Sequence, residues 1–79
     1  MGRSYHLSKR LAESQAEEIL REINELPGIK QAGFSAGMDY LEVETKDQEY
    51  SAVMSRAVNI FRRSGNGCEL SFSRFIQLG

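Results

Sequence analysis

The sequence predicts an α+β domain in which two helices cover one face of a four-stranded antiparallel sheet. Three observations support this prediction: two stretches with apolar residues at three- and four-residue spacing, four short stretches with apolar residues at every second position, and breaks rich in glycine or proline between them. The predicted order is strand, helix, strand, strand, helix, strand. The 79 residues are enough for one domain, 1–79, and leave no room for a second.

The first strand and the first helix are expected at residues 4–8 and 14–26. In the strand, the inward residues that alternate with polar ones are Tyr5 and Leu7. The apolar face of the helix consists of Ala16, Ile19, Leu20, Ile23 and Leu26. Ser14 is the expected N-cap, and Glu17 completes a capping box. Pro27 ends the helix, because the residue before a proline is pushed out of the helical region.

Two strands joined by a tight turn follow, at residues 29–36 and 40–45. Their inward positions are Ala32, Phe34, Ala36, Leu41 and Val43, which alternate with small or charged residues. The connection at 37–39 contains a glycine and is short enough for a hairpin.

The second helix and the last strand are expected at residues 48–64 and 68–75. The apolar stripe of the helix consists of Tyr50, Val53, Met54, Ala57, Ile60 and Phe61. Asp47 is the expected cap, and Gly65 or Gly67 supplies a left-handed stop. The inward residues of the last strand are Cys68, Leu70 and Phe72.

With right-handed crossovers, this order gives the ferredoxin-like βαββαβ arrangement with strand order 4-1-3-2. The face away from the helices is then expected to carry Ser4, His6, Ser8, Gln31, Gly33, Ser35, Glu42, Glu44, Glu69, Ser71 and Ser73. On that assignment the face has no aromatic residue on which RNA bases could stack, so binding of single-stranded RNA is disfavoured.

Composition excludes several classes of function. Ten basic and eleven acidic residues give a net charge of −1, so no overall attraction to nucleic acid or anionic lipid is expected. A small basic patch of Arg62, Arg63 and Arg74 is one interpretation of these residues, and ordinary surface charge is the preferred one. The single cysteine, Cys68, can form no internal disulfide, and a reduced cytoplasm is the expected compartment. No apolar run approaches the roughly 20 residues of a membrane span, and the first residues lack a signal-peptide segment.

The candidate chemical groups are few, and no enzyme activity is expected. No CxxC, HExxH or phosphate-loop pattern occurs. His6, the only histidine, is interpreted as a surface residue. Glu42 and Glu44 project from one open face, where solvated charge is favoured over acid–base work. A hard-ion site built from Glu13, Glu17 and His6 is the alternative to simple acidic capping of a helix, which is preferred.

Residues 19–32 read Ile-Leu-Arg-Glu-Ile-Asn-Glu-Leu-Pro-Gly-Ile-Lys-Gln-Ala, and the hairpin that follows contains Leu41-x-Val43. In these features the chain resembles the heavy-metal-associated domains, the small copper-chaperone-like modules of metal-transporting P-type ATPases. The resemblance covers nearly the whole chain. It implies the ferredoxin-like fold and a setting in metal transport.

The family binds metal through a Met-x-Cys-x-x-Cys loop between the first strand and the first helix. Two thiolates at this spacing hold Cu(I), or with added ligands Zn(II) or Cd(II). The family's spacing, counted back from Pro27, places the two cysteines at Ala12 and Gln15 and the methionine near Arg10. The resemblance therefore implies the fold and setting without the metal site, and no cofactor is expected.

The predicted function is that of a degenerate heavy-metal-associated-like domain, a regulatory or docking module of a cation-transporting ATPase system. Its expected partner is a protein, either domains of the parent ATPase or a metal chaperone, and it is expected to be a cytoplasmic monomer. Two alternatives stay open. One is a metal carrier that uses other ligands. The other is a small-molecule-sensing domain of the same fold, which Gly33 and Gly37 support only weakly.

Overall fold

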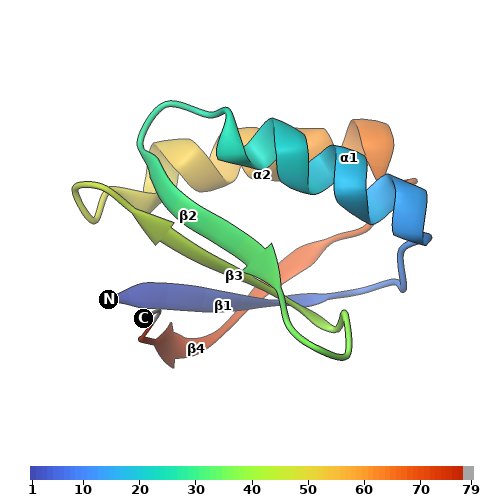
Figure 1. Ribbon diagram of the computed structural model, residues 1–79, viewed down its shortest axis with the longest axis horizontal. Coiled ribbons are helices and arrows are strands. Elements are labelled where there is room, and N and C mark those ends of the chain that lie inside the picture. Colours follow the sequence, from blue (N-terminus) through green and yellow to red (C-terminus); the bar gives the residue numbers. More distant parts are fainter. Residues whose placement is uncertain (78–79) are drawn as a thin grey trace.

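The computed structural model describes residues 1–77, which form one sheet covered on one face by two helices (Figure 1). In chain order the elements are β1 (Gly2–Leu7), α1 (Glu13–Asn24), β2 (Ile29–Phe34), β3 (Tyr40–Thr45), α2 (Tyr50–Ser64) and β4 (Leu70–Ile76). The antiparallel sheet has the order β2-β3-β1-β4, which is the predicted order read from the opposite edge. The ferredoxin-like prediction is therefore confirmed. Within this part of the chain, no helix has the length and apolar character needed to cross a membrane.

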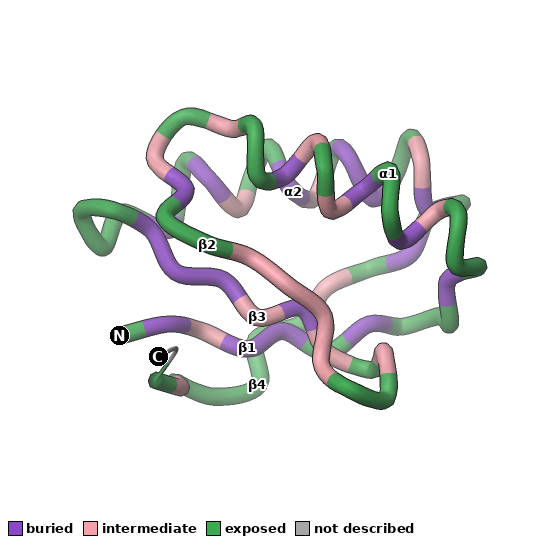
Figure 2. Tube along the Cα trace, viewed as in Figure 1, coloured by how far each residue is buried: buried purple, intermediate pink, exposed green. Residues whose placement is uncertain are grey.

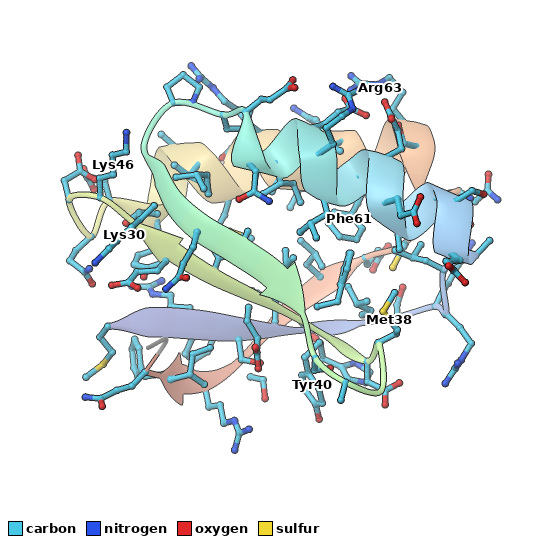
Figure 3. The ribbon with its side chains drawn as sticks, viewed as in Figure 1. Lys30, Met38, Tyr40, Lys46, Phe61 and Arg63 are labelled. Carbon is cyan, nitrogen blue, oxygen red and sulfur yellow. The ribbon has the colours of Figure 1, made fainter. Side chains whose placement is uncertain are left out.

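The core lies between the helices and the sheet, where the predicted apolar faces meet (Figure 2). Its members with no exposed surface are Ile19, Ile23, Leu41, Val43, Ala57 and Phe61. Phe61 lies between the two layers (Figure 3), and the edge of its ring meets Phe34 at a centroid distance of 6.4 Å. Because each of these side chains is enclosed, truncating one leaves a cavity rather than a solvated gap.

The start of α1 differs from the prediction. The N-cap is Ala12 rather than Ser14, and the predicted capping box of Ser14 with Glu17 is wrong. Gln15 supplies the interaction instead, because its Oε1 accepts a hydrogen bond from the backbone N–H of Ala12 at 3.0 Å. The alanine side chain has no oxygen that could accept a hydrogen bond from the first turn, so the contact from Gln15 back to the Ala12 backbone is the one half of a capping box that is present.

The start of α2 also lies beyond its predicted cap. Its N-cap is Glu49, and the carboxylate of Asp47 accepts a hydrogen bond from the Glu49 N–H at 3.1 Å, which forms a turn before the helix. At the other end of α2, Gly65 is the C-cap without a left-handed backbone, whereas Gly67 has φ of +76°. The other boundaries differ from the predicted ones by a residue or two, as helix and strand ends commonly do.

β4 is an edge strand, and this corrects the predicted core position of Phe72. Phe72 pairs with Tyr5 on the helix face, but half of its surface is exposed, because none of the described residues covers the outer side of β4. The pairing with β1 skips Ser73, which forms a β-bulge. After the bulge, Phe75 lies on the same face as Phe72, whereas Arg74 reaches the open face that was predicted for Ser73.

The open face of the sheet carries one aromatic residue that was not predicted there. Tyr40, at the start of β3, lies on the side of the sheet away from the helices (Figure 3). The edge of its ring meets His6 at a centroid distance of 5.3 Å. One tyrosine beside a histidine is still short of a row of exposed rings on which successive bases could stack.

Candidate functional site

The segment that joins β1 to α1, residues 8–12, is where the resemblance places a lost metal site. Leu11 anchors this loop in the core, whereas Arg10, the expected methionine position, is exposed. Ala12 is the N-cap of α1, and Gln15 lies three residues later in the first turn. The two positions of the family's cysteines therefore lie together at the start of one helix, close enough for the Gln15 side chain to reach the Ala12 backbone.

The Gln15 side chain joins the two helices. Its Oε1 accepts the hydrogen bond from Ala12, and its Nε2 donates a hydrogen bond of 3.4 Å to the carbonyl oxygen of Ser64, the last residue of α2. Terminal N–H and C=O groups of helices have no partner within their own helix. One amide therefore satisfies a donor at the start of α1 and an acceptor at the end of α2.

The loop also contacts the turn between α2 and β4. The Nζ atom of Lys9 donates to the carbonyl oxygen of Asn66 at 2.6 Å, and the Cys68 Sγ lies 3.6 Å from the carbonyl oxygen of Lys9. Ser8 and Glu69 exchange two hydrogen bonds of 2.8 and 2.9 Å. These contacts exist because β1 and β4 are neighbours, so the end of one strand meets the start of the other. The loop is therefore held by hydrogen bonds to the helices at its end and to the segment before β4 at its start.

Cys68 is buried in the core, as predicted, and its thiol is turned toward the underside of the loop. A buried free cysteine behaves as a small apolar residue with a weak S–H donor, which matches its contact with the Lys9 carbonyl. It is one soft ligand, whereas the family's Cu(I) site needs two.

The alternative hard-ion site is not assembled. Glu13 and Glu17 are exposed on α1, whereas His6 lies on the open face of the sheet, on the side away from both helices. Across residues 1–77, no group of three or more histidine, cysteine, aspartate or glutamate side chains is placed to hold a metal ion.

Glu44 is buried rather than solvated, which corrects the sequence prediction. Its carboxylate accepts a hydrogen bond of 3.1 Å from Gln31 Nε2 and lies 3.7 Å from the Nζ of Lys30. The hydrogen bond from Gln31, together with the charge of Lys30, outweighs desolvation and lowers the pKa of Glu44 below its ordinary value. The group is therefore ionised at neutral pH, which does not suit a general acid.

The arginines considered as a basic patch do not gather in one place. Arg63 forms an ion pair with Glu22 across the two helices, and Arg62 is exposed on α2. Arg74 lies on the open face of the sheet, on the opposite side of the molecule from the helices. This arrangement agrees with the interpretation of the three as ordinary surface charge.

One cluster, at the opposite end of β1 from the loop, was not predicted from the sequence. The Arg3 guanidinium carbon lies over the ring of Tyr50, 4.2 Å from its centroid, and 5.4 and 5.8 Å from the centroids of Phe75 and Phe72. The bulge at Ser73 turns Phe75 toward this cluster. Simple alternation along β4 places Phe75 on the other face, so the cluster was missed.

Two solved structures have the same fold. One, described as "CsoZ metallochaperone", matches with a TM-score of 0.66 and 11% identity over 91% of this chain and 97% of its own. Another, described as "Crosstalk between Cu(I) and Zn(II) homeostasis", matches with a TM-score of 0.63 and 15% identity over 92% of this chain and 98% of its own. At these identities the likeness shows the fold alone. No family model and no curated protein matches the sequence.

Proposed function

We propose that the chain is a degenerate heavy-metal-associated domain that acts in the cytoplasm as a docking module of a metal-transport system. The fold it shares with the two solved structures, one of them described as a metallochaperone, supports this setting. The resemblance of residues 19–32 to the family supports it independently, since that resemblance rests on sequence. In this proposal the domain contacts proteins that carry metal and does not carry metal itself.

The observation that carries the proposal is the use of Gln15. A loop that passes Cu(I) between proteins needs soft thiolates that a partner's thiolates can reach. Here Ala12 offers no donor atom, and the amide of Gln15 is a hard ligand already bound to the backbone at Ala12 and Ser64. The loop that serves metal exchange in the family therefore serves to hold α1 against α2 in this chain.

The proposed partners are the cytoplasmic domains of a cation-transporting P-type ATPase or a metallochaperone. Binding would depend on surface shape and charge, because no group of three or more histidine, cysteine, aspartate or glutamate side chains among the described residues is placed to hold a metal ion. We propose no enzyme activity for the isolated domain, since the sequence contains no CxxC, HExxH or phosphate-loop pattern.

The test is an NMR titration of the isotope-labelled domain with the purified metal-binding domain of the ATPase from the same organism. The partner is used both empty and loaded with Cu(I). The proposal predicts saturable shifts on one surface of this domain while Cu(I) stays on the partner. Transfer of Cu(I) to this domain would overturn it, as would an absence of shifts at a partner concentration of about 1 mM, where even weak complexes form.

A further inference from the structure

The outer edge of β4 is open. Within residues 1–77 the strand has one neighbour, β1, and most of its length is exposed (Figure 2). The unpaired N–H and C=O groups of an edge strand are a template for another strand. Proteins often protect such edges with charges and bulges, and β4 has one of each, at Arg74 and Ser73. It also presents two exposed aromatic side chains, which protection alone does not explain.

These aromatic side chains form an ordered cluster. Phe72 is 50% and Phe75 is 60% exposed, and their rings meet edge to face at a centroid distance of 5.2 Å. Tyr5 continues the cluster toward the core, 5.9 Å from Phe72. The Arg3 guanidinium is held beside these rings, and its Nε atom is buried without a hydrogen-bond partner in the part of the chain described. We call Arg3, Phe72, Arg74 and Phe75 the β4 surface.

The two faces of β4 differ in chemistry. Phe72 and Phe75 lie on the helix face, whereas Ser71 and Arg74 lie on the open face. Arg74 is exposed and forms no ion pair among the described residues. A strand laid along β4 would place its side chains alternately on these two faces. The complementary strand therefore has apolar residues against the phenylalanines and carboxylates against Arg74.

A second copy of this chain is a poorer match. Two half-exposed phenylalanines offer roughly 200 Å² of apolar surface, taking typical aromatic areas. Each partner in a stable interface contributes about 800 Å². Pairing two β4 strands antiparallel about their middle would also place the Arg74 side chains of both copies near each other on the same face, and like charges that are close together are destabilising. Area and charge both favour a transient contact with an acidic chain.

We propose that the β4 surface binds an extended segment of a protein partner by strand addition, a segment in which apolar residues alternate with glutamate or aspartate. Main-chain hydrogen bonds along Leu70–Ile76 would supply the pairing, and Phe72, Phe75 and Arg74 would supply the selectivity. This inference names a surface and a partner chemistry for the docking role proposed above, and it rests on that role for the existence of a partner.

The test is an NMR titration of the isotope-labelled domain with a short capped peptide of alternating valine and glutamate. The matched peptide has lysine in place of glutamate. The proposal predicts amide shifts centred on β4 and a dissociation constant of about 0.1 mM, as for other small, weak interfaces. Arg74→Glu should weaken binding of the glutamate peptide about tenfold and strengthen that of the lysine peptide, since close charges decide partner choice. Arg56→Glu, an exposed change on α2, is the control and should leave both affinities unchanged.

Three results would overturn the proposal: equal affinity for both peptides, shifts centred on the β2 edge, or a dimer in sedimentation equilibrium that Phe75→Ser dissociates. The last result would assign the surface to a second copy. The peptide titration and the titration with the ATPase domain test different proposals, so either proposal can fail without the other. If the peptide binds at β4 while the ATPase domain does not bind, the β4 surface stands and the proposed setting fails. If the ATPase domain binds and no peptide does, the proposed setting stands and the proposal for the β4 surface fails.

Discussion

Gln15 and Ser64 join the start of α1 to the end of α2, through a hydrogen bond of 3.4 Å from the Gln15 amide to the Ser64 carbonyl oxygen. The same side chain accepts the N–H of Ala12. By the family resemblance, Gln15 corresponds to the position of the second cysteine in the heavy-metal-associated domains. In this structure the Gln15 side chain connects the two helices instead.

Gln15→Ala should lower the free energy of unfolding by about 1 kcal/mol, because it removes one cap contact and one bond between helices. Ser14→Ala is the matched control. Ser14 is exposed and caps nothing, so this change should alter stability by less than about 0.5 kcal/mol. Urea unfolding of both variants measures the difference. An equal loss from both would restore Ser14 as the cap and contradict the role of Gln15.

Phe61→Ala should destabilise the domain far more than Phe34→Ala. Phe61 has no exposed surface, and its truncation should cost about 3–5 kcal/mol, a large share of the roughly 5–15 kcal/mol that holds a small domain folded. Phe34 is only partly buried at the end of β2, so part of its space can refill with water. Urea unfolding followed by circular dichroism gives both values. A larger loss from Phe34→Ala would contradict this order.

Glu44 should make the stability of the domain depend on pH in the acid range. The hydrogen bond from Gln31 and the charge of Lys30 lower the pKa of Glu44 in the folded state, so the ionised form stabilises the fold. This contribution is present above the ordinary glutamate pKa and is lost as the pH falls through the lower, folded value. Stability should therefore fall as the pH drops below about 4.5, the ordinary value.

Glu44→Gln should flatten this acid limb, and Gln31→Ala should raise the pKa of Glu44 toward its ordinary value because it removes the main hydrogen bond. Urea midpoints from neutral to acid pH measure the first effect, and NMR titration of the side-chain carboxyl carbon measures the second. A Glu44 carboxyl that titrates above its ordinary pKa in the intact protein would show that desolvation dominates instead.

The open face of the sheet should not bind single-stranded RNA specifically. Glu42 on this face repels phosphate, and the Tyr40 ring is in contact with His6. Fluorescence anisotropy with short RNA should show only weak binding that disappears as salt rises, because phosphate contacts release counterions. Micromolar binding that resists salt and is lost in Tyr40→Ala would contradict this prediction.

The fold and most of the core could be predicted from the sequence because both depend on periodicity. The three- and four-residue spacing of Ile19 and Ile23, and the alternation of Leu41 and Val43, place these residues in the core by geometry alone. Local spacing does not report which strand lies at an edge. Phe72 lies on the predicted face of the sheet, but half of its surface is exposed, since burial also depends on what covers a strand.

The features that the sequence did not predict depend on contacts between segments that are distant along the chain. The bulge at Ser73 reverses the faces of the residues that follow it, and this places Phe75 beside Arg3. The burial of Glu44 depends on the bulged strand opposite, which carries Lys30. Ala12 and Gln15 were located by family spacing, but the role of Gln15 depends on where α2 ends. None of these arrangements has a local sequence signal.

We propose that Ala12 and Gln15 occupy the positions of a metal site that this chain has lost. The measurement is competition with a Cu(I) chelator under reducing conditions, for the unmodified domain, Ala12→Cys with Gln15→Cys, each single variant, and Ala12→Ser with Gln15→Ser as control. We expect no tight Cu(I) binding by the unmodified domain or the serine control. The double cysteine variant should bind a single equivalent tightly, because both sulfurs lie at the start of one helix, and each single variant should bind far more weakly. Tight binding by the unmodified domain, or no gain in a correctly folded double cysteine variant, would contradict the claim.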